Sequence, residues 1–508
     1  MSCLSGRSIG SASPVQLNRS RLEFPVCLLV LIAFVSVVVQ ASLVVAAEPA
    51  AEPQAKAAAM VEEYVKSSKA AVGVSAIDLR RGETLIALKD QELYQPASNQ
   101  KLLTSAVALA RLGADFKFTT AVYLLGKDLT VRGDGDPSLG DPLLAAEQKK
   151  TIYDALDAWA AAVKDKAAAA FQGDLLLCGG AGAGKYRNGD WPQDQYRRWY
   201  VAPVAPLNFN DNCLDVSLRI DKGVIAAQVE PQTRYIKVVN GIKLGQKNLW
   251  SVQINKDNSV VTLVGTAVKA TAEPLSVAVD NPPLLLGRVL ADRLERAGVP
   301  VKGAIRVVEA DALDWSKAAS IARTETPLAV VMARANKRSL NMMAEGMLLR
   351  AGDGTWEGSA KLATETLTRD YGLPAEAFVL RDGSGLSRRD RVSPAAMSLL
   401  LAKLLQRKDA AVFLASLPIS GTDGTMADRL DEPAYRGRVL GKTGYIAGVS
   451  SLSGYVLDKG GKCVIAYSIL ANHVAEGFKA KQLQEKLCQM LVTWLDGADE
   501  PKTTAGSK

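Results

Sequence analysis

The feature that most constrains the fold is a change, within the chain, in the pattern of hydrophobic and turn-forming residues. Between Phe116 and about Ala319, short β-like runs alternate with Gly, Pro and Asn, whereas the flanking residues combine helical periodicity with alternating strands. The chain has 508 residues, of which 48% are hydrophobic, so it can bury more than one core. We therefore predict an α/β (α+β) domain built from both ends of the chain, residues 60–115 and 320–496, with one or more β-rich domains inserted at residues 116–319.

Periodicity in the two outer segments predicts individual elements. Alternating apolar residues indicate strands, and apolar residues three and four apart indicate helices. The expected helices span about residues 60–67, 98–112, 339–349, 359–371, 394–406 and 475–495, and the expected strands span 72–78, 84–88, 438–445, 449–457 and 462–470. Short turns separate the last three strands, which indicates an antiparallel meander.

The N-terminal residues resemble a secretory signal. Basic residues precede an apolar run from Val26 to Val39, and small residues lead up to Ala47. We expect residues 1–47 to be a cleaved signal peptide, 48–59 a linker and 497–508 a disordered tail. The alternative is that the apolar run is retained as a membrane anchor. In both cases the remainder of the chain is exported to a periplasmic or cell-wall space.

A single histidine, His473, is present in the whole chain. Ser-His-Asp enzymes, Cys-His enzymes and multi-histidine metal sites would all need this residue, so these classes are nearly excluded. The chain has no Cys-x-x-Cys pair, and we expect neither a metal nor another cofactor. The net charge is +8, but positive and negative residues are interspersed, a pattern that does not indicate a nucleic-acid partner.

The cysteines leave two alternatives open. Four follow the predicted signal peptide, at Cys178, Cys213, Cys463 and Cys488. An oxidising compartment allows one or two disulfides, and four cysteines admit three complete pairings. Four buried thiols are an equally good expectation.

Three short motifs follow one another along the chain: S-N-Q-K at 98–101, S-L-N at 339–341 and K-T-G at 442–444. Ser98 and Lys101 are three residues apart at the predicted start of a helix, so the hydroxyl lies within reach of the amine. The helix N-terminus adds backbone N–H groups that can stabilise an oxyanion. Ser339 is a candidate N-cap of the helix that follows it.

These motifs indicate a serine nucleophile that is activated by a lysine. A serine hydroxyl reacts poorly unless a neighbour takes its proton, and lysine is the available base in a chain with one histidine. Lys101 can take that proton only when its amine is neutral. Burial lowers the pKa of a lysine, and so does a nearby cation, which Lys442 would supply.

The ordered set resembles the motifs of the penicillin-recognising serine acyl transferases. The surrounding residues narrow the resemblance: Q-P-A-S-N-Q-K-L-L-T at 95–104, L-N-F-N-D-N at 207–212, D-G-S-G-L-S at 382–387 and G-K-T-G at 441–444. They are similar to the D-alanyl-D-alanine carboxypeptidase/endopeptidase family of the low-molecular-mass class C penicillin-binding proteins. This resemblance implies a penicillin-recognising, transpeptidase/β-lactamase-like catalytic domain, interrupted by inserted domains between the first two motifs.

The resemblance also implies the roles of the residues that move protons. Ser98 would be the acylated nucleophile and Lys101 its base. Ser339 would relay a proton toward the leaving amine. Asn341 would hold Lys101 and the substrate amide.

Further residues are implied to bind the substrate. Lys442 and Thr443 would hold the terminal carboxylate of the peptide, and Gly444 on its strand would let the substrate backbone approach. The backbone N–H groups of Ser98 and Tyr445 would form the oxyanion hole. Asp194 is a candidate contact for a side chain of the substrate.

By the same resemblance, the substrate is the stem peptide of peptidoglycan and β-lactam antibiotics are inhibitors. Apart from the resemblance, the net positive charge favours mild attraction to anionic surfaces, and we expect a loose association with the membrane or the wall. Two other functions stay open. A serine β-lactamase would lose bound penicillin rapidly, and a non-catalytic penicillin-recognising protein of the wall would not be acylated at all.

Overall fold

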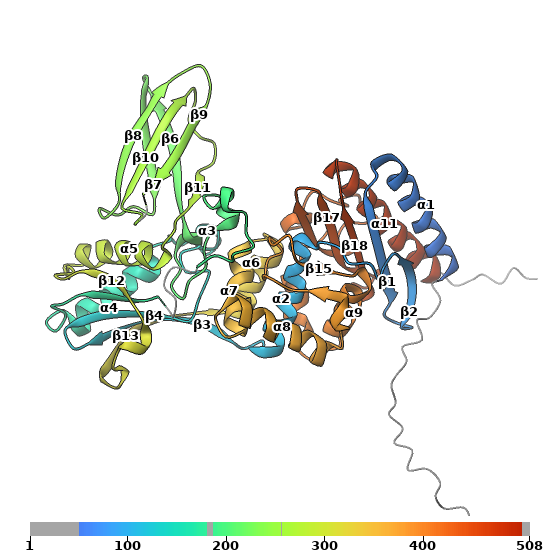
Figure 1. Ribbon diagram of the computed structural model, residues 1–508, viewed down its shortest axis with the longest axis horizontal. Helices are drawn as coiled ribbons and strands as arrows, with labels where there is room; N and C mark the ends of the chain where they lie inside the picture. The colour runs from blue at the N-terminus through green and yellow to red at the C-terminus, as the bar shows by residue number, and fades with distance from the viewer. Residues whose placement is uncertain (1–49, 180–185, 256, 500–508) are drawn as a thin grey trace, which may run out of the picture. The chain divides into compact units, whose positions relative to one another are not determined.

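The computed structural model describes residues 50–179, 186–255 and 257–499 (Figure 1). The predicted signal peptide and most of the predicted tail therefore lie outside the described residues. Within these ranges, no helix combines the length and the hydrophobicity that a membrane crossing requires.

A five-stranded sheet joins the two ends of the chain. Its strand order is β16-β17-β18-β1-β2, and all neighbours in it are antiparallel. The C-terminal meander thus pairs with the N-terminal hairpin, with Ala71 opposite Asn472. The strands are β1 (Ala71–Asp78), β2 (Glu83–Leu88), β16 (Val439–Ile446), β17 (Val449–Leu457) and β18 (Cys463–Asn472). This sheet is the centre of what we call the outer domain, residues 50–116 and 328–499.

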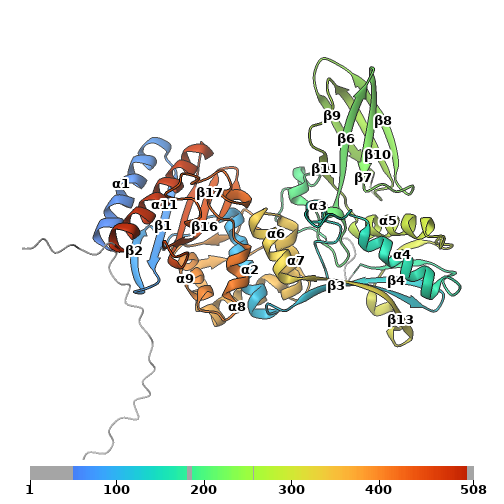
Figure 2. The ribbon, with the colours of Figure 1, turned by 180° about the vertical axis from the view of Figure 1, so that it is seen from behind.

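Two helices cover one face of the sheet, α1 (Ala51–Ser68) and α11 (Gly477–Asp499) (Figures 1 and 2). The prediction of a linker at residues 48–59 is wrong for residues 51–59, which form the first half of α1. Ala57 is fully buried in a core that includes residues of α11, and this packing stabilises an alanine-rich segment that would fray alone. The predicted tail is likewise helical as far as Asp499.

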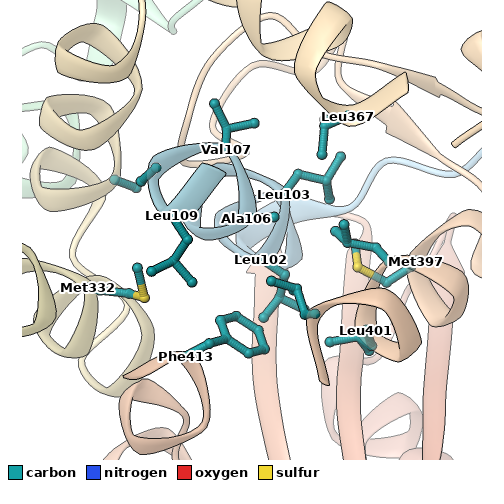
Figure 3. Close-up of a cluster of buried hydrophobic side chains, with 14 of the residues drawn as sticks. Leu102, Leu103, Ala106, Val107, Leu109, Met332, Leu367, Met397, Leu401 and Phe413 are labelled. Carbon is teal, nitrogen blue, oxygen red and sulfur yellow. The ribbon is translucent and has the colours of Figure 1, made fainter. Parts of the chain in front are cut away.

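The opposite face packs against a group of helices that surround α2 (Gln100–Arg111) (Figure 3). Residues 100–109 of α2 are all buried, as expected for a helix with neighbours on every side. Leu102 and Leu103 belong to the same core as Met397 and Phe413. The surrounding helices are α6 (Leu328–Lys337), α7 (Asn341–Ala351), α8 (Trp356–Tyr371), α9 (Pro394–Leu405) and α10 (Ala410–Ser416), with a short β14 (Phe378–Val379) and β15 (Arg391–Val392) beside them. The N-terminal end of α2 is therefore held rigidly.

The chain between the two outer segments, which we call the insertion (residues 117–327), begins and ends on neighbouring strands. β3 (Lys117–Leu125) pairs antiparallel with β13 (Ala318–Pro327), and the Leu328 N–H donates to the Phe116 carbonyl at 2.9 Å. Residues 320–327 therefore belong to the insertion, and the predicted boundary at 319/320 is wrong. Sequence periodicity could not place it, because the pairing joins residues far apart in the chain.

Within its described residues the insertion contains three sheets, in agreement with the predicted β-rich character. The five-stranded sheet has the order β12-β5-β4-β3-β13, and the two three-stranded sheets have the orders β11-β6-β7 and β8-β10-β9. The remaining strands are β4 (Asp128–Gly133), β5 (Leu175–Cys178), β6 (Cys213–Asp221), β7 (Val224–Glu230), β8 (Lys237–Leu244), β9 (Leu249–Ile254), β10 (Val260–Ala267), β11 (Leu275–Ala278) and β12 (Ile305–Val308), and the helices are α3 (Pro142–Glu147), α4 (Asp154–Ala167) and α5 (Pro282–Arg296). All of these elements except α3 contribute to one hydrophobic core that includes Trp159 and Leu290.

The four cysteines of the described chain are buried free thiols. The sequence left disulfides and four buried thiols as alternatives, and the structure has the four thiols. Burial raises the pKa of Cys213 well above its usual range, so this thiol is a poor nucleophile.

Candidate active site

The structure brings Ser98, Lys101, Ser339, Asn341 and Lys442 together from four separate elements. Ser98 lies in a 3-10 turn, Ala97–Asn99, directly before α2, and Lys101 lies in the first turn of that helix. Ser339 connects α6 to α7, and Asn341 is the first residue of α7. Lys442 is in the middle of β16. All three predicted motifs therefore meet at one place.

Lys101 is fully buried, and its Nζ has three hydrogen-bond partners. Nζ lies 2.9 Å from Ser98 Oγ, 2.7 Å from Asn341 Oδ1 and 3.0 Å from the Ser384 carbonyl oxygen. The last two oxygens can only accept. A neutral amine has two N–H groups and one lone pair, so these two acceptors use both N–H groups and leave the lone pair directed at the Ser98 hydroxyl. This geometry is that of a base poised to take the serine proton.

Burial is also the main reason why Lys101 can be neutral. It lowers the pKa of Lys101 from the ordinary 10.5 to about 7, while the buried carboxyl groups of Glu345 and Asp382 act in the opposite direction. Burial also lowers the pKa of Lys442 well below its ordinary value, and the charge of Lys101 lowers it further. The repulsion between two ammonium groups is mutual, so it opposes a charge on both amines at once.

The turn that carries Ser98 is fastened to the sheet. Asn99 Nδ2 donates to the Lys442 carbonyl at 2.6 Å, and Ser453 Oγ donates to Asn99 Oδ1 at 2.6 Å. A Cβ atom at Gly444 would lie only 2.9 Å from the Ser98 nitrogen. Glycine at this position therefore allows the Ser98 backbone to approach β16, beside the predicted oxyanion hole.

Ser339 has a different backbone position from the one predicted. It is not an N-cap, because α7 begins after Leu340 and Ser339 has a left-handed backbone with φ of 57°. Its Oγ accepts a hydrogen bond from Lys442 Nζ at 2.9 Å. A left-handed conformation costs a residue with a Cβ about 1–2 kcal/mol, and such strain concentrates at functional sites.

The predicted substrate-binding residues differ in their exposure and in their contacts with the site. Thr443 is half-buried and its Oγ1 donates to Thr425 Oγ1 at 2.8 Å, while the Tyr445 side chain is 66% exposed. Asp194 is exposed in a 3-10 turn, Gln193–Gln195. In the described part of the chain, no hydrogen bond or ion pair links Asp194 to Ser98, Lys101 or the other motif residues.

The insertion reaches the site through other residues. Asn341 Nδ2 donates to the Tyr200 carbonyl at 2.8 Å, and Trp191 Nε1 donates to Asp382 Oδ2 at 2.9 Å. A cavity of about 370 Å³ adjoins Asn341 and is lined in part by Trp199 and Asp215. The insertion thus contributes a wall to the site, although it supplies none of the three motifs.

Sequence reasoning from the motifs missed Glu345 and Thr425. Glu345 is fully buried on α7 and accepts the N–H of Ser384, whose carbonyl holds Lys101. A lone acidic residue in an apolar helical stretch could have drawn attention to Glu345. Ser384 lies in the D-G-S-G-L-S motif, but the sequence assigned it no role of its own, because it acts through its backbone. Among the described residues, no three His, Cys, Asp or Glu side chains are grouped so that they could hold a metal ion.

Comparisons with known proteins agree with this geometry. Residues 54–494 match the model of the D-Ala-D-Ala carboxypeptidase 3 (S13) family. A D-alanyl-D-alanine carboxypeptidase from Actinomadura sp. (strain R39) is 31% identical over 437 residues, 79% of this chain and 77% of the relative. The D-alanyl-D-alanine carboxypeptidase DacB of Haemophilus influenzae is 23% identical over 440 residues, 82% of this chain and 89% of that protein.

A solved structure shows the same fold. The crystal structure of penicillin binding protein 4 (dacB) from Haemophilus influenzae superposes with a TM-score of 0.70 at 22% identity, and the match covers 85% of this chain and 99% of that one. The penicillin-recognising fold and the family predicted from the motifs are thereby confirmed. The chain belongs to the D-Ala-D-Ala carboxypeptidase 3 (S13) family and is a serine-type D-Ala-D-Ala carboxypeptidase.

Proposed function

We propose that Ser98 performs this reaction through an acyl-enzyme on the stem peptide of peptidoglycan. Neutral Lys101 takes the Ser98 proton, and Oγ attacks the carbonyl carbon of the penultimate D-alanine. The N–H groups of Ser98 and Tyr445 hold the resulting oxyanion. The peptide C–N bond then breaks, and the leaving amine receives the proton through Ser339. Water hydrolyses the ester and restores the Ser98 hydroxyl.

One observation carries this proposal: the buried Lys101 amine, whose two obligatory acceptors direct its lone pair at Ser98 Oγ. A protein that only bound peptidoglycan would gain nothing from burying two lysines, because removing each charge from water is costly. The same nucleophile would react with β-lactams. Neither cleavage of the stem peptide nor acylation by a β-lactam requires the rapid hydrolysis of the penicillin ester that defines a β-lactamase.

A stem pentapeptide and its C-terminal amide test the assignment of Lys442 and Thr443. The free acid is expected to lose its terminal D-alanine, and the amide is expected to react about a hundredfold more slowly in kcat/KM, because a charged hydrogen bond to a buried lysine is lost. Chromatography of the tetrapeptide product measures both rates. Equal rates for the two peptides would overturn the assignment of the carboxylate site.

We also propose that the protein is exported and that residues 1–47 are removed. The support is the order of basic residues, apolar run and small residues in the N-terminal segment. The substrate class agrees, because peptidoglycan is assembled outside the cytoplasm. N-terminal sequencing of the protein from the producing cell is expected to begin at Glu48, whereas a chain that begins at Met1 would mean that the apolar run is retained.

A loose association with anionic envelope surfaces is supported by one end of the insertion. Four exposed apolar side chains and four exposed lysines lie in the turns that follow β6, β8 and β10 and in the strand residues next to these turns: Val224, Leu244, Leu249, Val268, Lys222, Lys243, Lys247 and Lys269. None of these lysines has an ion-pair partner within the described ranges. Apolar side chains between cations suit the surface of a membrane that contains anionic lipid.

The mature protein is expected to sediment with vesicles that contain anionic lipid at low salt and to be released at about 0.5 M salt, since salt screens exposed charges. The double variant Lys243→Glu/Lys247→Glu should stay in solution. Lys149→Glu/Lys150→Glu, which changes two exposed lysines elsewhere in the insertion, is the matched control. Sedimentation that is absent, or equal for all three proteins, would contradict this association.

A further inference from the structure

Glu345 is a buried carboxyl group at the active site that the reaction described above does not use. Its side chain is 0% exposed, on α7 one helical turn after Asn341. Oε2 accepts the Gly383 N–H at 2.7 Å and Oε1 accepts the Ser384 N–H at 2.8 Å. Two backbone N–H groups donate to one carboxyl group, so this short segment of the loop is firmly held.

The loop segment that Glu345 holds leads directly to the acceptor of the base. Thr104 Oγ1 of α2 donates to the Gly383 carbonyl at 2.7 Å, so the Gly383–Ser384 peptide unit is held on both sides. A Cβ atom at Gly383 would lie 2.8 Å from the Ala344 carbonyl, so glycine allows the loop to lie against α7. The next peptide unit carries the Ser384 carbonyl, which accepts one N–H of Lys101 at 3.0 Å, and its Gly385 N–H donates to Asp382 Oδ1 at 2.7 Å. The acceptor for Lys101 is therefore fixed by two successive held peptide units.

The charges around Lys101 come from three elements. Glu345 lies on α7, Asp382 and Asp390 on the loop between β14 and β15, and Lys442 on β16. Asp382 Oδ1 also accepts the N–H groups of Ser384 and Gly385. Burial and the neighbouring Asp382 raise the pKa of Glu345 to about 8, and burial raises the pKa of Asp390 well above its usual range. Burying these ionisable groups costs folding free energy, which argues that they have a function at the site.

We propose that Glu345 is a positioning residue for the base: it fixes the Gly383–Ser384 peptide unit, directly before the Ser384 carbonyl, so that this carbonyl orients the Lys101 amine. This inference rests on the proposed role of Lys101. It explains why a carboxyl group that touches neither nucleophile nor substrate is buried beside the site. Asn341 and Glu345, one turn apart, would then set two of the three contacts of Lys101 from a single helix.

The test is the pH dependence of acylation by a fluorescent penicillin, measured as a second-order rate constant from about pH 5 to 9. Lys101 must be neutral to act, so the rate of the wild-type protein should rise through the pKa of Lys101. Glu345→Gln places an amide NH2, which cannot accept a hydrogen bond, against one of the two loop N–H groups. A displaced Ser384 carbonyl no longer accepts from the Lys101 ammonium, so the rise should move to lower pH, and the plateau should fall about tenfold to a hundredfold because the acceptor loop is displaced.

Two further variants complete the test. Glu345→Asp withdraws the carboxyl group from the two N–H groups, so its midpoint and plateau should change in the same directions. Asp78→Asn changes another buried carboxyl group of the outer domain and should alter neither quantity. A folded Glu345→Gln protein with the wild-type midpoint and plateau would overturn the inference. If Glu345→Gln does not fold, a wild-type plateau in Glu345→Asp overturns it.

Failure of this inference can be told apart from failure of the proposed function. If Glu345 variants behave as the wild type while Lys101→Met does not react, Lys101 is the base and Glu345 does not position it. If Lys101→Met reacts as fast as the wild type, the proposed role of Lys101 is itself wrong, and the inference about Glu345 falls with it.

Discussion

Replacing Ser98 with alanine is expected to abolish both penicillin labelling and the release of D-alanine from a stem pentapeptide. The hydroxyl is the atom that forms the ester, and the other groups of the site cannot replace it. Removal of a nucleophile from a lysine- or histidine-activated site lowers kcat by about ten-thousandfold or more. A denaturing gel after incubation with a fluorescent penicillin, together with an assay for free D-alanine, measures both effects.

Ser75→Ala is the matched control for this experiment. Ser75 is a buried serine of the same sheet, hydrogen-bonded to Ser398 Oγ at 2.7 Å, and its variant should label like the wild type. A labelled band that persists in Ser98→Ala would place the acylated residue elsewhere. In the wild type, rapid loss of the band would favour a β-lactamase, and no band at all would favour a non-catalytic wall protein.

Lys101→Met is expected to have the second largest effect, a loss of about a thousandfold to ten-thousandfold in the rate of acylation. Methionine fills a similar volume but has no lone pair on nitrogen to take the Ser98 proton. The residual rate should also lose its dependence on pH near 7, because the group whose pKa burial lowers to about 7 is gone. Rates of penicillin labelling at several pH values test both statements, and an unchanged pH profile would contradict them.

The same variant has a consequence for stability. Since the folded pKa of Lys101 lies below its ordinary 10.5, the unfolded chain binds this proton more tightly than the folded one between about pH 7 and 10.5. Below that window Lys101 destabilises the fold by up to about 5 kcal/mol, and the penalty fades as pH rises. Urea unfolding at about pH 7 and 9.5 should therefore show a larger gain in stability for the wild type than for Lys101→Met. An equal increase in the free energy of unfolding for both proteins would contradict a lowered pKa of the buried Lys101 amine.

The sequence predicted the parts of the site that are local in the chain. Ser98 and Lys101 are one helical turn apart, so their spacing alone places them together. The order of the three motifs identified the family. What it missed depends on contacts between distant residues. Ser384 contributes a backbone carbonyl, for which every residue type is equivalent, and the left-handed backbone of Ser339 is set by its place between α6 and α7 rather than by its side chain.

The fold shows the same division. Alternation and helical periodicity placed the five strands of the β16-β17-β18-β1-β2 sheet and the helices α2, α7, α8, α9 and α11 within a few residues, whereas α6, α10, β14 and β15 were not predicted. The start of the folded chain was misplaced, because the alanine-rich residues 51–59 become a stable helix only by packing on α11. The end of the insertion was misplaced because β13 is defined by its pairing with β3, and a strand partner cannot be read from the strand alone.

The pairing of β3 with β13 also governs how such a protein can diversify. Phe116 and Leu328 are hydrogen-bonded neighbours, so the insertion leaves and rejoins the outer domain at one point. The ends of the gap in the catalytic domain are held together whatever lies between them, and the entropy of closing a loop grows only slowly with its length. Segments of very different size can therefore be exchanged at this junction without moving Ser98 or Lys442, which makes it a natural splice point for new substrate-binding modules.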